Sequence, residues 1–160
     1  PPLFLHFGIV RPARSGKLDR HGEMLEEVVA GGDRALARAI AEMGGTGFAY
    51  PHDGIREDIP EAVVMSSDIV AALGWMALPE CSHWFIDNVW ADLGRGAGCL
   101  RHLRAVKVEH AWKGDQTSRE SSGTLTADRE AYYAWRRSQR MQQDIDTVIS
   151  LRESRVLQPA

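Results

Sequence analysis

The sequence predicts an α/β fold, and three observations support this class. Segments with a helical spacing of apolar residues alternate with short apolar runs of strand length. A glycine pair, Gly44-Gly45, separates one such helix from the next strand, as in the αβ unit of a layered fold. The chain has 160 residues, 44% hydrophobic and 26% charged, which is enough for one domain with a core. We therefore expect a single α/β domain over residues 1–125, followed by a helix over 126–155.

The first half of the chain begins with a predicted strand, Leu3–Val10, and then a polar stretch over 11–32 that predicts no firm element. Asp33 suits a helix N-cap and Gly44-Gly45 suit the helix end, so Asp33–Met43 is predicted to be helical. The apolar run Gly47–Tyr50 predicts a short buried strand that stops at Pro51.

The same alternation continues to the middle of the chain. Ala62–Met65 predicts a strand, and Ser66-Ser67-Asp68 predict the start of a helix that reaches Leu73 before Gly74. The remaining predictions are a loop over Trp75–Cys81, a helix that begins at Ser82 or Asp87 and ends at Gly94, Gly96 or Gly98, and a strand over Val106–His110.

A long C-terminal helix is predicted from a Thr126 cap to about Arg155. Its apolar stripe comprises Tyr132, Trp135, Met141, Ile145, Val148 and Ile149. Such a stripe packs on the protein's own domain or on a partner, so a homodimer through this helix is an open alternative.

Composition excludes several functional classes. A formal charge of −3 does not favour a broad nucleic-acid-binding surface, although Arg136, Arg137 and Arg140 form a local basic group. Two cysteines, Cys81 and Cys99, give neither a disulfide framework nor zinc-ligand spacing. No apolar run approaches bilayer length. We expect a soluble, cytoplasmic protein that does not act on membranes.

The segment "HWFIDNVWADLG" places a carboxylate and an amide, Asp87 and Asn88, inside an aromatic run. Because burial of an uncompensated carboxylate is costly, Asp87 must be capped, paired or facing solvent. One interpretation makes Asp87 the cap of the helix that continues through Trp90. The other places it at the rim of a pocket lined by Trp84 and Trp90, and the two are compatible. Asp92 is predicted to face solvent.

Histidines supply a second set of candidates. His110 closes an alternating run in "VEHAWKGDQT" and could ligate a divalent metal, although a lone histidine more often has no such role. His52-Asp53 in "YPHDG" is explained equally well by turn chemistry. The sequence has no GxGxxG, P-loop, GxSxG or HExxH motif, so the corresponding nucleotide-binding and hydrolase classes are not supported.

Four segments in order, over residues 31–118, resemble the C-terminal half of GT-A type glycosyltransferases, particularly small enzymes of actinobacterial and phage genomes. They are "GGDRALARAIAEMGGTGFAYPHDG", "PEAVVMSSDIVAALGWMALP", "HWFIDNVWADLGRGAG" and "VKVEHAWKGD". The resemblance implies a GT-A-like mixed sheet flanked by helices, with an incomplete nucleotide-binding half, since only about 30 residues precede the matching region.

The resemblance also assigns roles to residues. It implies Asp87 as the catalytic base, with an acceptor site formed by Trp75, Met76, Trp84 and Asn88. It implies a Mn²⁺ or Mg²⁺ ion held by His110 and Glu27, and a donor site that includes Lys113 and Asp115. A metal offsets the charge of a leaving diphosphate while a carboxylate deprotonates the attacking hydroxyl.

Two functional hypotheses follow. The first is a metal-dependent hexosyltransferase that uses a nucleotide diphosphate sugar and an unknown acceptor, possibly in a truncated form. The alternative is a non-catalytic interaction or structural protein that retains the scaffold.

Overall fold

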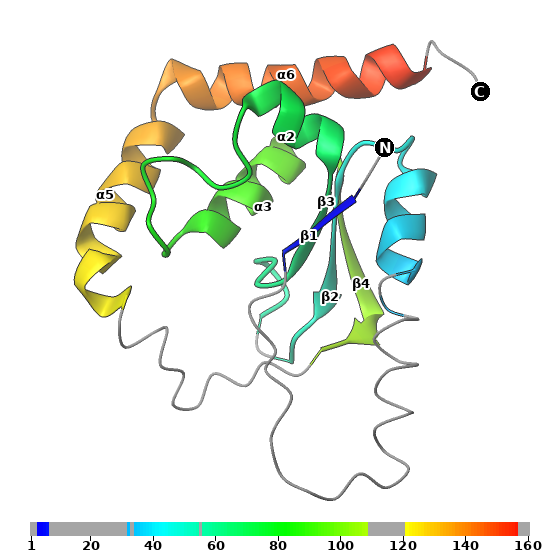
Figure 1. Cartoon of the computed structure of the whole chain (residues 1–160), viewed down its shortest axis with the longest axis horizontal. Coiled ribbons are helices and arrows are strands. Elements are labelled where there is room, and N and C mark those ends of the chain that lie inside the picture. The colour runs from blue at the N-terminus through cyan, green and yellow to red at the C-terminus, as the bar shows by residue number, and fades with distance from the viewer. Residues whose placement is uncertain (1–2, 7–31, 33, 55, 109–120, 157–160) are drawn as a thin grey trace, which may run out of the picture.

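The chain forms an α/β structure in which helices lie on both faces of a four-stranded mixed sheet (Figure 1). The computed structural model describes residues 3–6, 32, 34–54, 56–108 and 121–156. The strands are β1 (Leu3–His6), β2 (Phe48–His52), β3 (Val63–Ser66) and β4 (Leu100–Lys107), in the spatial order β1-β3-β2-β4. The α/β class predicted from the sequence is therefore confirmed, and the sheet is mixed.

Strand β3 is antiparallel to both of its neighbours, whereas β2 and β4 are parallel. Phe48 lies opposite Met65 on β3 and opposite Leu100 on β4, which places β2 in the interior of the sheet. The ladder between β2 and β4 is irregular between Pro51 and His52. Since β2 and β4 are parallel, their carboxyl ends meet at one edge of the sheet, and the loop that follows β2 begins there.

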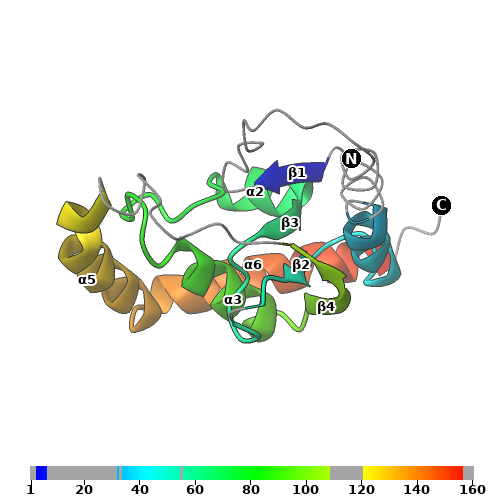
Figure 2. The same cartoon turned by 90° about the horizontal axis from the view of Figure 1, so that it is seen from below.

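Two hydrophobic layers cover the sheet. A helix over 34–42 packs on one face through Leu36, Ala39 and Ile40, which contact Ala49 and Val64. The other face is covered by α2 (Ser67–Leu73), α3 (Ile86–Gly96) and α6 (Gln139–Val156), as Figure 2 shows from below. Because successive side chains of β2 and β3 alternate between these two layers, both strands are buried along almost their whole length.

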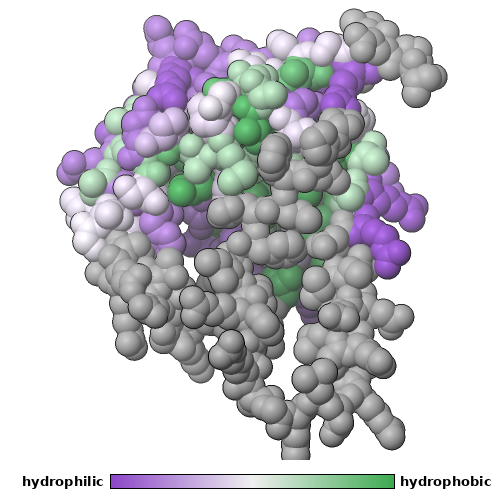
Figure 3. Space-filling view, in the orientation of Figure 1, coloured by the Kyte–Doolittle hydropathy of each residue, from purple (hydrophilic) through white to green (hydrophobic). Residues whose placement is uncertain are grey.

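The C-terminal stripe packs within the chain. Tyr132, Trp135, Ile145 and Val148 are buried in the main core, and Met141 and Ile149 pack against it. In Figure 3 hydrophilic side chains lie along the outer side of α6, while hydrophobic ones gather between α6 and the sheet. Of the two uses predicted for the stripe, packing on the protein's own domain is the one found, so these side chains are not an open dimer surface.

Several element predictions are confirmed. The helix over 34–42 and the strand β3 lie where expected, and α2 ends at Gly74, whose φ of 78° is left-handed. Residues 75–81 form the predicted loop. Strand β1 covers the first part of the predicted Leu3–Val10, and the rest of that strand lies outside the described residues.

Three predictions of where strands and helices begin or end were wrong. Strand β2 does not stop at Pro51 but continues to His52. Strand β4 begins at Leu100, not Val106. Its first half is half-buried and includes polar residues, so the sequence shows no continuous apolar run there.

The third error is the single long helix, which is in fact two helices, α5 (Leu125–Arg136) and α6. Ser138 ends α5 by donating both its backbone N–H and its hydroxyl to the carbonyl of Trp135. A short 3₁₀ turn, Ser121–Thr124, precedes α5, so Thr126 is not its cap.

No helix among the described residues is both long enough and apolar enough to cross a bilayer.

Close approach of α3 to the sheet depends on Gly94. A Cβ there would lie 2.9 Å from Cβ of Leu100 and 3.1 Å from the ring of Phe48. Any larger residue would push the helix away from the strands that it covers.

Candidate functional site

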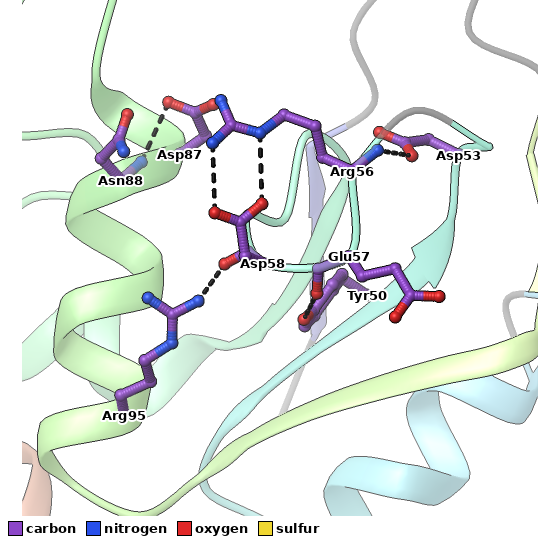
Figure 4. Close-up of polar contacts among 8 residues, drawn as sticks. All are labelled: Tyr50, Asp53, Arg56, Glu57, Asp58, Asp87, Asn88 and Arg95. Atoms are coloured by element: carbon purple, nitrogen blue, oxygen red, sulfur yellow. Dashed lines mark hydrogen bonds and ion pairs between the residues drawn. The ribbon is translucent and has the colours of Figure 1, made fainter.

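A group of charged side chains lies where the amino end of α3 meets the loop that follows β2 (Figure 4). We call Arg56, Asp58 and Asp87 the Asp87 cluster. In Figure 4 the guanidinium of Arg56 lies between the carboxylates of Asp58 and Asp87. Arg56 donates to both oxygens of Asp58, at 3.2 and 3.1 Å. The cluster thus holds two carboxylates and one shared cation at the edge where the parallel strands end.

Two further contacts fix the loop that carries this cluster. The backbone N–H of Arg56 donates to Oδ1 of Asp53 at 3.0 Å, which is the turn chemistry predicted for the "PHDG" segment. The guanidinium of Arg95, from α3, donates to the backbone carbonyl of Asp58. The loop is therefore tied to the helix that carries Asp87.

Asp87 is half-buried in the first turn of α3. Its Oδ1 accepts the backbone N–H of Asn88 at 2.9 Å. Burial raises the pKa of Asp87, and the local backbone N–H groups together with the charges of Arg56 and His83 offset this only in part. A carboxylate with a raised pKa beside a cation is suited to accept a proton.

The prediction that Asp87 caps α3 was wrong. The N-cap position is Phe85, and Asp87 lies inside the helix. Phe85 has a φ of 67°, a left-handed conformation that a non-glycine residue adopts at a cost. Its ring stacks on Tyr132 with centroids 5.3 Å apart and an interplanar angle of 18°, a contact that helps to hold it there.

The segment before α3 is held by the carboxylate of Asp128, a role that the sequence did not indicate. Asp128 of α5 accepts the backbone N–H groups of Ser82, His83 and Trp84 at 2.8–3.0 Å. The hydroxyl of Thr124 donates to it at 3.1 Å. Burial alone would raise the pKa of Asp128, but these donors outweigh burial and lower it. The sequence showed only an acidic residue in a first helical turn.

The aromatic residues predicted around Asp87 have different roles. Trp90 does not line a pocket, because it is buried in the core and its Nε1–H donates to the carbonyl of Met76 at 2.8 Å. Trp75 and Met76 are partly buried and pack on the same core. Trp84 is half-buried and meets the ring of His83 edge-on, with centroids 5.1 Å apart.

Asp92 does not face solvent as predicted. Its carboxylate accepts the hydroxyl of Tyr132 at 2.8 Å and pairs with Nε of Arg136 at 3.1 Å, and its side chain is 12% exposed. Arg140 likewise pairs with Glu80 at 2.5 Å, so two arginines of the predicted basic group are engaged by acids. Asp92 and Glu80 lie on other elements than the arginines they pair with, so no local pattern in the sequence indicates these pairs.

Four predicted site residues, Glu27, His110, Lys113 and Asp115, lie outside the described residues. Of the acceptor residues, Asn88 follows Asp87 in α3 and is half-buried. Within the described ranges, no three His, Cys, Asp or Glu side chains are arranged to hold a metal ion. The described side chains therefore do not form a metal site, and the predicted ligands remain a prediction.

Both cysteines are buried and reduced, and burial raises the pKa of each thiol to about 11. A thiol of this kind is a poor nucleophile near neutral pH, so neither cysteine is a candidate for covalent catalysis.

Comparisons with protein-family models, with curated proteins and with solved structures found no match to this chain.

Proposed function

We propose that the protein is a glycosyltransferase that moves a hexose from a nucleotide diphosphate sugar to an acceptor hydroxyl, with Asp87 as general base. One observation carries the proposal. Asp87 is a half-buried carboxylate with a raised pKa, beside Arg56, at the edge where the parallel strands end. Ligands of α/β proteins commonly bind at this edge.

The proposed chemistry uses Asp87 as the proton acceptor. The acceptor hydroxyl oxygen attacks the anomeric carbon, its proton passes to Oδ of Asp87, and the bond from that carbon to the diphosphate breaks. Arg56 favours the ionised form of Asp87, although Asp58 holds the same guanidinium. Asp87 is thereby kept able to accept a proton without being held in a tight ion pair.

The resemblance of four ordered segments to GT-A enzymes supports this assignment. One of these segments supplies the first turn of α3 with Asp87, whereas Arg56 and Asp58 lie between two of the segments. A bound Mn²⁺ or Mg²⁺ would offset charge on the diphosphate, and His110 and Glu27 are its predicted ligands. No step is assigned to that ion, because the described residues do not form its site.

The test compares Asp87→Asn with the wild type in a transfer assay with Mn²⁺ and a panel of nucleotide diphosphate sugars. We expect turnover to fall by about 10²–10⁴-fold, the usual loss when a general base is removed. Asp146→Asn, an exposed aspartate of α6, is the matched control and should keep full activity.

Ligand binding gives a second readout. Mn²⁺ with the matching nucleotide diphosphate should raise the melting temperature, since a ligand that binds only the folded state stabilises it. A folded protein with neither turnover nor a thermal shift would contradict the proposal. That outcome would favour the alternative, a non-catalytic protein that retains the scaffold.

A further inference from the structure

A polar cavity lies beside the loop that carries the Asp87 cluster, on the face of β4 that α3 covers. Its volume is about 560 Å³, and the residues that line it include Tyr50, Glu57, Arg95, His102 and Arg104. A volume of this order accommodates a small organic molecule and exceeds what a single ion needs. We call this cavity the β4 groove.

Two guanidinium groups reach the β4 groove from different walls. Arg95 projects from α3 and Arg104 from β4. Figure 4 shows Arg95 reaching towards the loop that carries Glu57, with Tyr50 beside that loop. Within the described residues, Arg95 donates to a carbonyl and forms no ion pair. Among the lining residues the two arginines outnumber the one acid, Glu57. Asp58 and Asp53 also act electrostatically on Tyr50 and His102, respectively.

The partner of Arg104 can be displaced. Arg104 Nη2 lies 3.0 Å from Oε2 of Glu57, with the two side chains 73% and 57% exposed. An ion pair this open to water is weak. A more highly charged oxyanion could therefore take Arg104 from Glu57 and bring it together with Arg95.

The inner wall of the groove is formed by two stacked rings. His102 stacks on Tyr50, with centroids 4.5 Å apart and an interplanar angle of 3°. Its Nε2 is buried, and no described residue hydrogen-bonds to it. Burial lowers the pKa of His102, so the ring is neutral near pH 7.

We propose that the β4 groove binds a phosphate ester of about hexose size, with its phosphate between Arg95 and Arg104. Two guanidinium forks supply more N–H donors than one carboxylate can accept, and the terminal oxygens of a phosphate use them better. The remaining volume holds the uncharged part of the ligand. This site does not rest on the transferase proposal, because none of its residues belongs to the Asp87 cluster.

The test uses isothermal titration of the whole chain with glucose 1-phosphate and inorganic phosphate, and with glucose as the uncharged control. We expect glucose 1-phosphate to bind more tightly than glucose, with inorganic phosphate between them. Arg104→Gln should weaken glucose 1-phosphate binding about fivefold, the factor for one solvent-exposed charged contact. Arg101→Gln is the matched control. Arg101 lies on the same strand as Arg104 but pairs with Glu42 outside the groove, so its substitution should not change binding.

Glu57→Gln distinguishes this site from a diffuse attraction of anions. Removal of Glu57 frees Arg104, so glucose 1-phosphate should bind about fivefold more tightly. Asp87→Asn should leave binding in the β4 groove unchanged. Equal binding of glucose and its phosphate, an equal loss in Arg101→Gln, or NMR shifts centred on Asp87 and not on His102 would overturn the proposal.

Discussion

Asp87 of α3 and Asp128 of α5 are two carboxylates near the amino end of α3, and their pKa values are shifted in opposite directions. Burial acts to raise the pKa of both. Asp128 is surrounded by three backbone N–H groups and the Thr124 hydroxyl, and its pKa is lowered. Asp87 has fewer compensating contacts among the described residues, and its pKa is raised.

The difference separates a structural acid from a chemical one. A buried carboxylate with enough hydrogen-bond donors stabilises the fold when it is ionised. A buried carboxylate with too few donors lowers stability when it is ionised and remains able to accept a proton. Because Asp128 holds the segment that leads into α3, the structural acid also positions the reactive one. Four experiments test this contrast, beginning with the largest expected effect.

Asp128→Ala should lower the free energy of unfolding by about 3 kcal/mol, because three backbone N–H groups lose the buried carboxylate that accepts them. Urea unfolding followed by circular dichroism measures the loss. Glu130→Ala, on an exposed position of the same helix, is the control and should change the free energy by less than about 0.5 kcal/mol. A similar small change in both variants would mean that Asp128 does not hold the loop.

Asp87→Asn should have the opposite sign and raise the free energy of unfolding by about 1 kcal/mol at pH 7, the usual gain when an unfavourable functional group is removed. The native state binds the Asp87 proton more tightly than the unfolded chain does. The wild type therefore loses stability as the pH rises from the ordinary aspartate pKa through the raised one, and the variant lacks this loss.

The Asp128 contribution runs the other way with pH. Because its folded pKa is lowered, its stabilisation is present above the ordinary aspartate pKa and is lost as the pH falls through the folded value. Unfolding free energies from pH 3 to pH 8 for wild type, Asp87→Asn and Asp128→Asn separate the two slopes. Slopes of the same sign for both sites would contradict the comparison.

Arg56→Gln should have the smallest effect on stability, less than about 0.5 kcal/mol, because its ion pair with Asp58 is exposed. Its expected effect is on chemistry. Loss of the Arg56 charge should raise the pKa of Asp87 further, and an NMR titration of the Asp87 carboxyl carbon measures it. Arg101→Gln, whose partner is Glu42, should leave that pKa where it is.

Local sequence signals predicted the elements with clear ends. The helix over 34–42 and α2 each have a polar start and a glycine at the end, and these signals act within a few residues. Strand β4 was only partly predicted, because Arg101, His102 and Arg104 do not form a continuous apolar run. A strand at the edge of a sheet can carry such residues, since one side of it meets water.

The candidate site was predictable only in its central residue. Asp87 stood out because a carboxylate interrupted an aromatic run, but its environment comes from Arg56, which is distant in sequence. Asp128 could not be identified, because its partners are backbone groups more than 40 residues away. Likewise the break between α5 and α6 contains neither glycine nor proline, so Ser138 was its one signal.

The bonds from residues 82–84 to Asp128 also bear on local opening of the protein. The amide protons of Ser82, His83 and Trp84 are held by a side chain of α5, not by a neighbouring turn. They can exchange with solvent deuterium only when α5 moves away or that segment detaches. These three amides should therefore exchange together, and their shared protection would report how often the first turn of α3 loses its support.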